Sequence, residues 1–364
     1  CSHSCQAWRS GFLAEPAHRH HAFTHIKTTQ RVLGEFPPMT WQTFSGSEAE
    51  WDNLAISLAS TSPYQTSAWA SFKRSAGWSS VRLLTTDGRC AVQVLIKHFM
   101  FVSIVWAPGG PIGEVTEAGL IDLAAAIKTE SPSLVQYVRV SDFRPSLPAL
   151  HKQYELAGWH RPRATLSAAQ TLTCELNRNT LGSNYSKNWS RNLRRGEDRG
   201  ITASAWLPAD STEIARLHQS VVTTKGLETN DWRTRPAEVA QLLECFANQL
   251  VLVKATDAAG TLLALRGAVV IGGFGFDFLA ATSVDGRKNY ASNVALHHLL
   301  DVLTTRGVTA YDFGGVDYHA NKGVYDFKHG AGGTEHSYVG EFEMVRPRIL
   351  RSFISTMVAS RLPK

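Results

Sequence analysis

The sequence predicts an α/β protein with two domains, and three observations support this. Stretches typical of strands alternate with stretches of helical periodicity, which favours α/β layers over a helical bundle or a β-sandwich. The chain has 364 residues, long for one domain and sufficient for two. Hydrophobic residues make up 43% and charged residues 19%, so the chain can bury a sizeable core.

Residues 1–38 differ from the rest of the chain. They begin with Cys1, show little periodicity and carry Cys5 beside crowded histidines, in a spacing that matches no usual zinc site. We therefore expect a leader that is not part of the native fold, and Met39 as the natural start.

From Met39 onward, alternation of apolar and polar residues predicts strands, and apolar residues at helical spacing predict helices. Pro63 and the turn Pro108-Gly109-Gly110-Pro111 separate elements of the first half. The expected strands of this half are 39–44, 80–85, 89–101, 104–107 and 134–140, and the expected helices are 48–60, 67–76, 117–129 and a short one ending near Gly158.

The second half repeats this rhythm, which suggests duplication although no sequence repeat is visible. Its expected strands are 171–175, 250–256, 261–271, 274–281 and 310–312, and its expected helices are 181–199, 212–223, 235–247 and 292–306. The longest apolar stretch, 262–284, is interrupted by Arg266 and Asp277, so no membrane span is expected.

Charge and cysteine content restrict the partners and the compartment. A net charge of +6 favours an anionic partner such as nucleic acid, a phosphorylated small molecule or a membrane surface. A protein that is merely basic is the alternative. Cys90, Cys174 and Cys245 form no Cys-x-x-Cys pair, which fits a reducing cytosol.

The most informative stretch is 311–333, where glycines at Gly314-Gly315 and at 330–333 bracket Lys328. Glycine serves where the backbone needs positive φ or approaches a ligand closely. We interpret the lysine as part of a strand-edge site for an anionic or carbonyl-bearing substrate. A plain loop between strands is the alternative.

Five motifs, in order across nearly all of 39–364, resemble those of the Fem-type aminoacyltransferases, which build peptidoglycan interpeptide bridges. They are the Gln-Thr-Ser-Ala-Trp segment that leads to Lys73, the Gly-Pro turn at 106–111, Ser190-Arg191-Asn192-Leu193-Arg194-Arg195, Tyr311-Asp312-Phe313-Gly314-Gly315, and Gly323-Val324-Tyr325-Asp326-Phe327-Lys328.

This resemblance implies two acetyltransferase-like (GNAT-like) domains that share a substrate cleft. It implies that residues 39–167 together with 339–364 form the first domain, which binds the acceptor, and that residues 168–338 form the second, with the donor and catalytic motifs. The implied donor is aminoacyl-tRNA, and the implied acceptor is a nucleotide- or lipid-linked muropeptide. Such a protein serves cell-wall biogenesis and cell shape in the cytoplasm, and we expect a monomer without cofactor or metal.

Three positions depart from the family pattern and leave the acceptor open. Ala331 stands where an aromatic is frequent, and Phe276-Asp277-Phe278 replaces an aromatic pair. Lys225 stands where arginine is more usual, which keeps the charge and loses bidentate phosphate recognition.

Aminoacyl transfer needs an amine to attack an activated ester, a proton acceptor and stabilisation of the oxyanion. Lys328 is the candidate for the electrostatic role; it could instead clamp a tRNA phosphate or be a solvated lysine. Asp312, Asp317 and Asp277 are candidates for the base, with turn or capping roles as the alternative. The sequence contains no Gly-x-Ser-x-Gly or His-Glu-x-x-His motif, which disfavours covalent and metal mechanisms.

The best polyanion signal lies in the helix expected at 181–199. Lys187, Arg191, Arg194 and Arg195 share one face of it, which suits phosphate contacts or is a solvated face. Lys73 and Lys225 are candidate ligands for the phosphates of the precursor, with ordinary surface lysines as the alternative. The closing motifs add Phe327, Gly314, Gly315 and Gly330 as substrate-binding candidates.

The segment 346–364 predicts a basic amphipathic helix with Leu350, Phe353, Ile354, Met357 and Val358 on one side. Core packing is the first interpretation of this helix, and peripheral membrane contact is the second.

Three other functions remain open at this point. A coenzyme-A-dependent N-acyltransferase would share the fold, but 286–293 lacks the small-residue spacing of a pyrophosphate loop. A non-catalytic RNA-binding protein lacks support, because no aromatic and basic residues interleave as in an RNA module. The same transfer chemistry on a peptide-antibiotic acceptor is the third.

Overall fold

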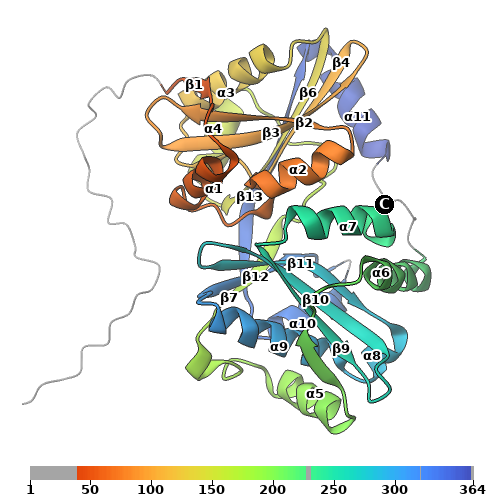
Figure 1. Ribbon diagram of the computed structural model, residues 1–364. Helices are drawn as coiled ribbons and strands as arrows, with labels where there is room; N and C mark the ends of the chain where they lie inside the picture. The colour runs from red at the N-terminus through yellow and green to blue at the C-terminus, as the bar shows by residue number, and fades with distance from the viewer. Residues whose placement is uncertain (1–38, 227–230, 320, 362–364) are drawn as a thin grey trace, which may run out of the picture. The chain divides into compact units, whose positions relative to one another are not determined.

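The computed structural model describes residues 39–226, 231–319 and 321–361 (Figure 1). The expected leader, 1–38, lies outside the described residues, and so does the side chain of Lys225.

The first half begins with a short strand and two helices whose starts are capped by side chains. Ser47 and Glu50 form a capping box on the first helix, and the Thr66 hydroxyl accepts from Trp69 N at the second. The elements of this half are β1 (Trp41–Thr43), α1 (Glu48–Ser57), η1 (Pro63–Gln65), α2 (Ser67–Ser75), β2 (Ser79–Thr85), β3 (Cys90–Phe99), β4 (Val102–Pro108), β5 (Ile112–Gly113), α3 (Glu117–Glu130), β6 (Val135–Pro145) and α4 (Pro148–Leu156).

The second half follows after a connecting segment. Its elements are β7 (Gln170–Glu175), η2 (Arg178–Thr180), α5 (Lys187–Asp198), β8 (Thr202–Ala205), α6 (Ser211–Lys225), η3 (Trp232–Thr234), α7 (Pro236–Cys245), β9 (Leu250–Thr256), β10 (Leu262–Ile271), β11 (Phe274–Thr282), α8 (Val284–Lys288), α9 (Ala291–Thr305), β12 (Ala310–Val316) and α10 (Lys322–Gly330). The chain then adds β13 (Thr334–Arg346), η4 (Arg348–Leu350) and α11 (Arg351–Arg361).

The strands of both halves form one mixed sheet, which has 13 strands among the described residues. Each half contains one parallel pair: β4 with β6, and β11 with β12. The pair in the first half stays in register from Val102 to Pro108 on β4, whereas the pair in the second half separates after Phe276 and Asp312. This separation opens the second half of the sheet where the candidate site lies.

The long strand β13 joins the halves. Thr334–Ser337 pair with β7, and residues from Tyr338 to Arg346 pair with β6, with a register shift between Tyr338 and Gly340 (Figure 1). The chain thus passes from the second half back to the first within this one strand. The exact limits of the two domains stay a prediction.

Three larger groups of buried apolar residues hold these layers. One lies in the first half around Val94, Val105 and Leu120, and one lies in the second half around Leu299 and Tyr311. The third contains Trp69 and Phe72 of α2 together with residues of α6, α7, β10 and β11. This third group contains residues of both halves. Full burial of a large apolar side chain contributes about 1.5–3 kcal/mol, so the group stabilises the association of the two halves.

The helices and strands expected from the sequence are mostly present, with two corrections. The helix expected at 181–199 begins only at Lys187, where the Ser186 hydroxyl caps it by accepting from Trp189 N. The C-terminal helix packs with Leu350, Ile354 and Val358 against the sheet, but Phe353 and Met357 are exposed. Among the described helices, none combines the length and the hydropathy needed to cross a bilayer.

Candidate functional site

A cleft of about 1050 Å³ lies between the two halves of the sheet. Residues of β11 and β12 that follow the point of separation form one wall, with Asp277, Phe278, Phe313 and Gly314. Helix α2 and strand β4 contribute Trp69, Lys73 and Trp106 from the first half. The prediction of two halves with a cleft between them is therefore confirmed.

Lys328 lies in this cleft, but on a helix and not on the strand edge expected from the sequence. It belongs to the last turn of α10, which begins after Asn321, whose side chain accepts from Val324 N. Its ammonium donates to the carbonyl oxygens of Gly314 and Gly315, both at 3.0 Å. An ammonium has three donors, so one N–H remains beyond the two bonds made within the described residues.

The surroundings of Lys328 disfavour the charged form of its side chain. The side chain is buried, and this burial lowers its pKa below the ordinary value of 10.5. Asp277 acts in the opposite direction, and Arg266 adds to the lowering. Gly314 has a φ of +74°, and a Cβ there would come within 3.8 Å of the lysine Nζ. Glycine is therefore required here for the positive φ of the turn, because a Cβ would only be in ordinary contact with the ammonium.

Arg266 and Asp277 form a buried ion pair beside Lys328. The guanidinium lies 3.3 Å from Asp277 Oδ2, and it donates to the Ser292 hydroxyl at 2.9 Å. The other carboxylate oxygen accepts from the Tyr311 hydroxyl at 2.9 Å. These two residues are the charges that interrupt the apolar stretch 262–284, and they are partners on adjacent strands. Among the described residues, Asp277 is the only carboxylate that lines the cleft.

Asp312 lies below the cleft surface, where three donors occupy its carboxylate. Gly314 N and the Tyr338 hydroxyl each donate to it at 2.7 Å, and the Thr171 hydroxyl makes a short bond to Oδ1. Burial raises its pKa, although these hydrogen bonds oppose the rise. The geometry suits Asp312 to fixing the turn that carries the two carbonyls bonded to Lys328.

Asp317 is not part of this cleft. It is exposed and lines a neighbouring hollow with Tyr318, Tyr325 and Glu335, and it accepts from His319 N at 2.9 Å. Of the four residues considered as catalytic from the sequence, Lys328 and Asp277 line the cleft, whereas Asp312 and Asp317 do not.

The substrate-binding candidates also separate into two groups. Lys73, Phe327, Gly314 and Gly315 line the cleft. Gly330 instead packs against α5, because a Cβ there would meet Trp189 and Ser186 at 3.2 Å.

The basic stripe on α5 is present, with Arg191, Arg194 and Arg195 exposed, whereas Trp189 of the same helix is buried. These arginines do not line the cleft. Arg191 donates to the Asn188 side chain at 2.5 Å, and Arg195 to the Tyr290 hydroxyl at 3.4 Å. The stripe is therefore a surface feature outside the Lys328 site.

Three cleft cations were not singled out as site residues from the sequence. Arg233 and Arg287 line the cleft together with Arg266, Lys73 and Lys328. Arg233 is held in a bidentate pair by Asp231, with atoms 2.6–2.9 Å apart. The sequence gives a signal for Arg266, because it is a single arginine within the apolar strand β10. We find no comparable signal for Arg233 or Arg287. The cleft carries five basic side chains and one carboxylate among the described residues, which makes it a strongly cationic surface.

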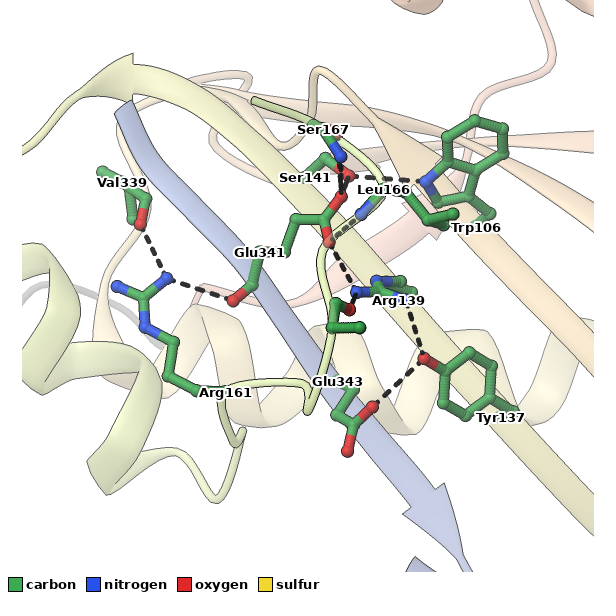
Figure 2. A network of polar contacts seen from close by, with 11 residues as sticks. Trp106, Tyr137, Arg139, Ser141, Arg161, Leu166, Ser167, Val339, Glu341 and Glu343 are labelled. Atoms are coloured by element: carbon green, nitrogen blue, oxygen red, sulfur yellow. Dashed lines mark hydrogen bonds and ion pairs between the residues drawn. The ribbon is translucent and has the colours of Figure 1, made fainter. Parts of the chain in front are cut away.

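A buried polar network supports the wall formed by the segment between α4 and β7 (Figure 2). Arg139 of β6 and Glu341 of β13 are 2.6 Å apart and almost fully buried. The Glu341 carboxylate also accepts from Leu166 N and from Ser167 N, both at 2.9 Å. Leu166 and Ser167 line the cleft. The ion pair thus holds a cleft wall in place from the first half of the sheet.

No group of three or more His, Cys, Asp or Glu residues within the described ranges could hold a metal ion. The chemistry available to this site consists of a positioned ammonium, an ion-paired carboxylate and further cations. Such a site can bind an anionic substrate and stabilise negative charge that develops on an oxygen.

No protein-family model matches the sequence, and no curated protein matches it either. Solved structures do match its fold. The structure of FemX matches with a TM-score of 0.74 and 15% identity, over 86% of this chain and 100% of that one. The C-terminal domain of a putative lysylphosphatidylglycerol synthetase from Agrobacterium fabrum matches with a TM-score of 0.53 and 13% identity, over 87% of this chain and 98% of that one.

A tandem GNAT protein from the clavulanic acid biosynthesis pathway also has a TM-score of 0.53, at 11% identity, over 84% of this chain and 98% of that one. At such identities the likeness concerns the fold alone. It confirms the prediction of an α/β protein with two GNAT-like halves, and the fold is the one shared with FemX.

Proposed function

We propose that the protein is an aminoacyltransferase that moves an amino acid from aminoacyl-tRNA to the side-chain amine of a peptidoglycan stem peptide. One observation carries the proposal: Lys328 is held by the Gly314 and Gly315 carbonyls beside the Arg266–Asp277 pair, in a cationic cleft. The motifs that resemble the Fem-type enzymes contribute Lys328, Gly314 and Gly315, and the FemX fold supports the same assignment.

In this reaction the acceptor amine attacks the ester carbonyl carbon of the charged tRNA. A C–N bond forms, the ester C–O bond breaks, and the ribose hydroxyl leaves. Lys328 is placed to stabilise the oxyanion of the tetrahedral intermediate, for which a fixed cation in a desolvated site is effective. Asp277, which lines the cleft, is the carboxylate best placed to take the proton of the amine.

Phosphates of the acceptor fit the remaining cations of the cleft. Lys73 is half-buried and lies over the rings of Trp69 and Trp78, at 5.3 and 6.0 Å. Burial lowers its pKa, and the neighbouring Lys97 adds to the lowering. A bound phosphate would stabilise the charged form of Lys73, which burial disfavours. We therefore propose Lys73 and Arg233 as ligands of a nucleotide- or lipid-linked precursor. Both substrates place the reaction in the cytoplasm, where we propose that the protein acts as a monomer.

Incubation with charged total tRNA and candidate muropeptide precursors should yield aminoacylated muropeptide, detected by mass spectrometry. Ribonuclease treatment should abolish the product, since the donor is consumed, and deacylated tRNA should give none. Transfer from acetyl-coenzyme A that persists after complete tRNA digestion would overturn the proposal in favour of an N-acyltransferase. Product formed on a peptide antibiotic and on no muropeptide would change the acceptor alone.

The stripe on α5 is proposed to contact tRNA phosphates. Arg191→Ala with Arg195→Ala should raise KM for charged tRNA and flatten the slope of log KM against log salt by roughly one to two units, because counterion release scales with the phosphates contacted. The matched control is Lys128→Ala with Lys152→Ala, which removes two exposed charges from the first half. An unchanged slope in the α5 variant would show that this face is only solvated.

A further inference from the structure

One end of the first half of the sheet exposes large apolar side chains from three segments. Met100 is 96% exposed, Ile349 is 88% exposed and Leu134 is 78% exposed. Phe99, Phe101, Phe353 and Met357 are also exposed. Exposed apolar residues scattered singly need no explanation, but a cluster indicates an interaction surface.

Backbone pairing brings the segments that carry these residues together at one end of the sheet. Phe99 pairs with Val102 across the turn between β3 and β4, and Val102 pairs with Val135 of β6. Val135 N donates to the Phe101 carbonyl at 3.0 Å, so Leu134 lies next to the turn. One strand further on, Gln136 pairs with Arg346, and η4 follows directly.

Helix α11 extends this cluster along the same side of the sheet. Its inner side chains pack on Ile104, Val135, Tyr137 and Val345. Phe353 and Met357 are four residues apart and exposed on its outer side, and the exposed Ile349 precedes them in η4. Core packing therefore explains the apolar side chains on the inner side of α11, but not those on its outer side.

The lysines, arginines, aspartates and glutamates of these segments are unevenly represented, because only the basic ones occur. Segments 97–104, 131–137 and 346–361 contain five lysines and arginines, and neither aspartate nor glutamate. Two of these cations are engaged within the fold: Lys97 donates to the Ala76 carbonyl at 2.8 Å, and Arg346 to the Ala124 carbonyl at 2.6 Å. Within the described residues, Arg348 and Arg351 form no ion pair with a carboxylate, and Arg348 is exposed.

We propose that this basic apolar tip, formed by Phe99, Met100, Phe101, Leu134, Ile349, Phe353 and Met357 with Arg348 and Arg351, docks on the surface of an anionic lipid bilayer. The apolar side chains enter the interfacial region, and the arginines contact the anionic headgroups. This surface combines exposed aromatic and aliphatic side chains with charged residues that are all cationic. Two copies of the chain would therefore repel each other at this surface, which favours an anionic bilayer over a second copy as the partner.

The docking is independent of the proposed reaction, because it uses no residue of the cleft. It would place the protein where a lipid-linked acceptor is presented, and in that respect it deepens the proposed function. A soluble, nucleotide-linked acceptor should be processed equally well by a variant that no longer docks, so failure of docking and failure of transfer can be told apart.

The test is flotation of the full chain with vesicles of phosphatidylglycerol and phosphatidylcholine in equal parts, and with vesicles of phosphatidylcholine alone. The protein should float with the anionic vesicles and not with the neutral ones, and high salt should weaken the binding. Met100→Asp with Ile349→Asp should reduce partitioning at least tenfold. Arg348→Gln with Arg351→Gln should have a similar effect, since each cation near an anionic surface contributes about fivefold.

The matched control is Leu207→Asp with Val284→Asp, which introduces two carboxylates at exposed apolar positions of the second half and should float like the unmodified protein. Thermal unfolding of each variant separates loss of docking from loss of folding. Absence of binding to anionic vesicles, or equal binding by the Met100 and Ile349 variant, would overturn the proposal. A concentration-dependent dimer that the same variant abolishes would assign the surface to a second copy instead.

Discussion

Lys328→Ala is expected to lower the single-turnover rate about a hundredfold, because a preorganised donor at a developing oxyanion contributes on the order of 3 kcal/mol to the transition state. The unfolding free energy should change by only about 1–2 kcal/mol: two carbonyls lose a partner, but a buried charge is also removed. Single-turnover kinetics and denaturant unfolding on the same preparations measure both quantities.

Lys322→Ala is the control on the same helix. Its ammonium is exposed and pairs with Asp326 at 2.5 Å, so its loss should leave the rate unchanged. Lys328→Arg should rescue poorly, because a planar guanidinium cannot occupy the position of the ammonium between the two carbonyls. A normal rate in Lys328→Ala would remove this residue from the mechanism, and a collapsed unfolding midpoint would make it structural.

The lowered pKa of Lys328 gives this prediction a pH signature. The ammonium is present below its folded-state pKa and is lost as pH rises through that value, which burial places below 10.5. The alkaline limb of the rate profile should therefore begin earlier than for an ordinary lysine. Residual activity in Lys328→Ala should lack this limb.

Arg139→Met is expected to cost about 3–5 kcal/mol of unfolding free energy, the largest effect on stability that we predict. Glu341 is almost fully buried beside Arg139, and removal of one partner leaves its charge uncompensated. Glu341→Gln in the same chain should restore part of the loss, because it removes that charge and keeps one acceptor oxygen, which can serve either Leu166 N or Ser167 N.

Arg216→Met is the matched control, because Arg216 forms an exposed pair with Glu213 at 3.6 Å and should contribute less than about 1 kcal/mol. Urea titration measures all three variants. An Arg139→Met protein as stable as the Arg216→Met protein would show that the buried network does not support the fold.

The alternation of strands and helices was predictable from the sequence because its periodicity is local. The helix α10 was not, since Lys322–Gly330 contains Gly323 and Gly330, which disfavour a helix by about 1 kcal/mol each. The Asn321 cap and the packing of Gly330 on Trp189 compensate for this, and the second of these depends on a segment far away in sequence.

The candidate site was predictable where it rests on motifs and not where it rests on pairing between strands. Lys328, Gly314 and Gly315 belong to one stretch of sequence. Arg266 and Asp277 become partners only because β10 and β11 are adjacent. Asp312 has the residue type of a base, yet three donors from Thr171, Gly314 and Tyr338 converge on it, and no local pattern indicates this.

The position of β13 affects how the protein can be made. This strand lies in the middle of the sheet, between β6 and β7, although it is the last strand along the described chain. A ribosome supplies residues in order, so β6 and β7 keep open hydrogen-bonding edges until residues 334–346 have been synthesised. Unpaired edges invite pairing with other chains. A nascent chain of this protein therefore has a long period in which neither half can complete its sheet, and its dependence on chaperones during translation should be set by this one strand.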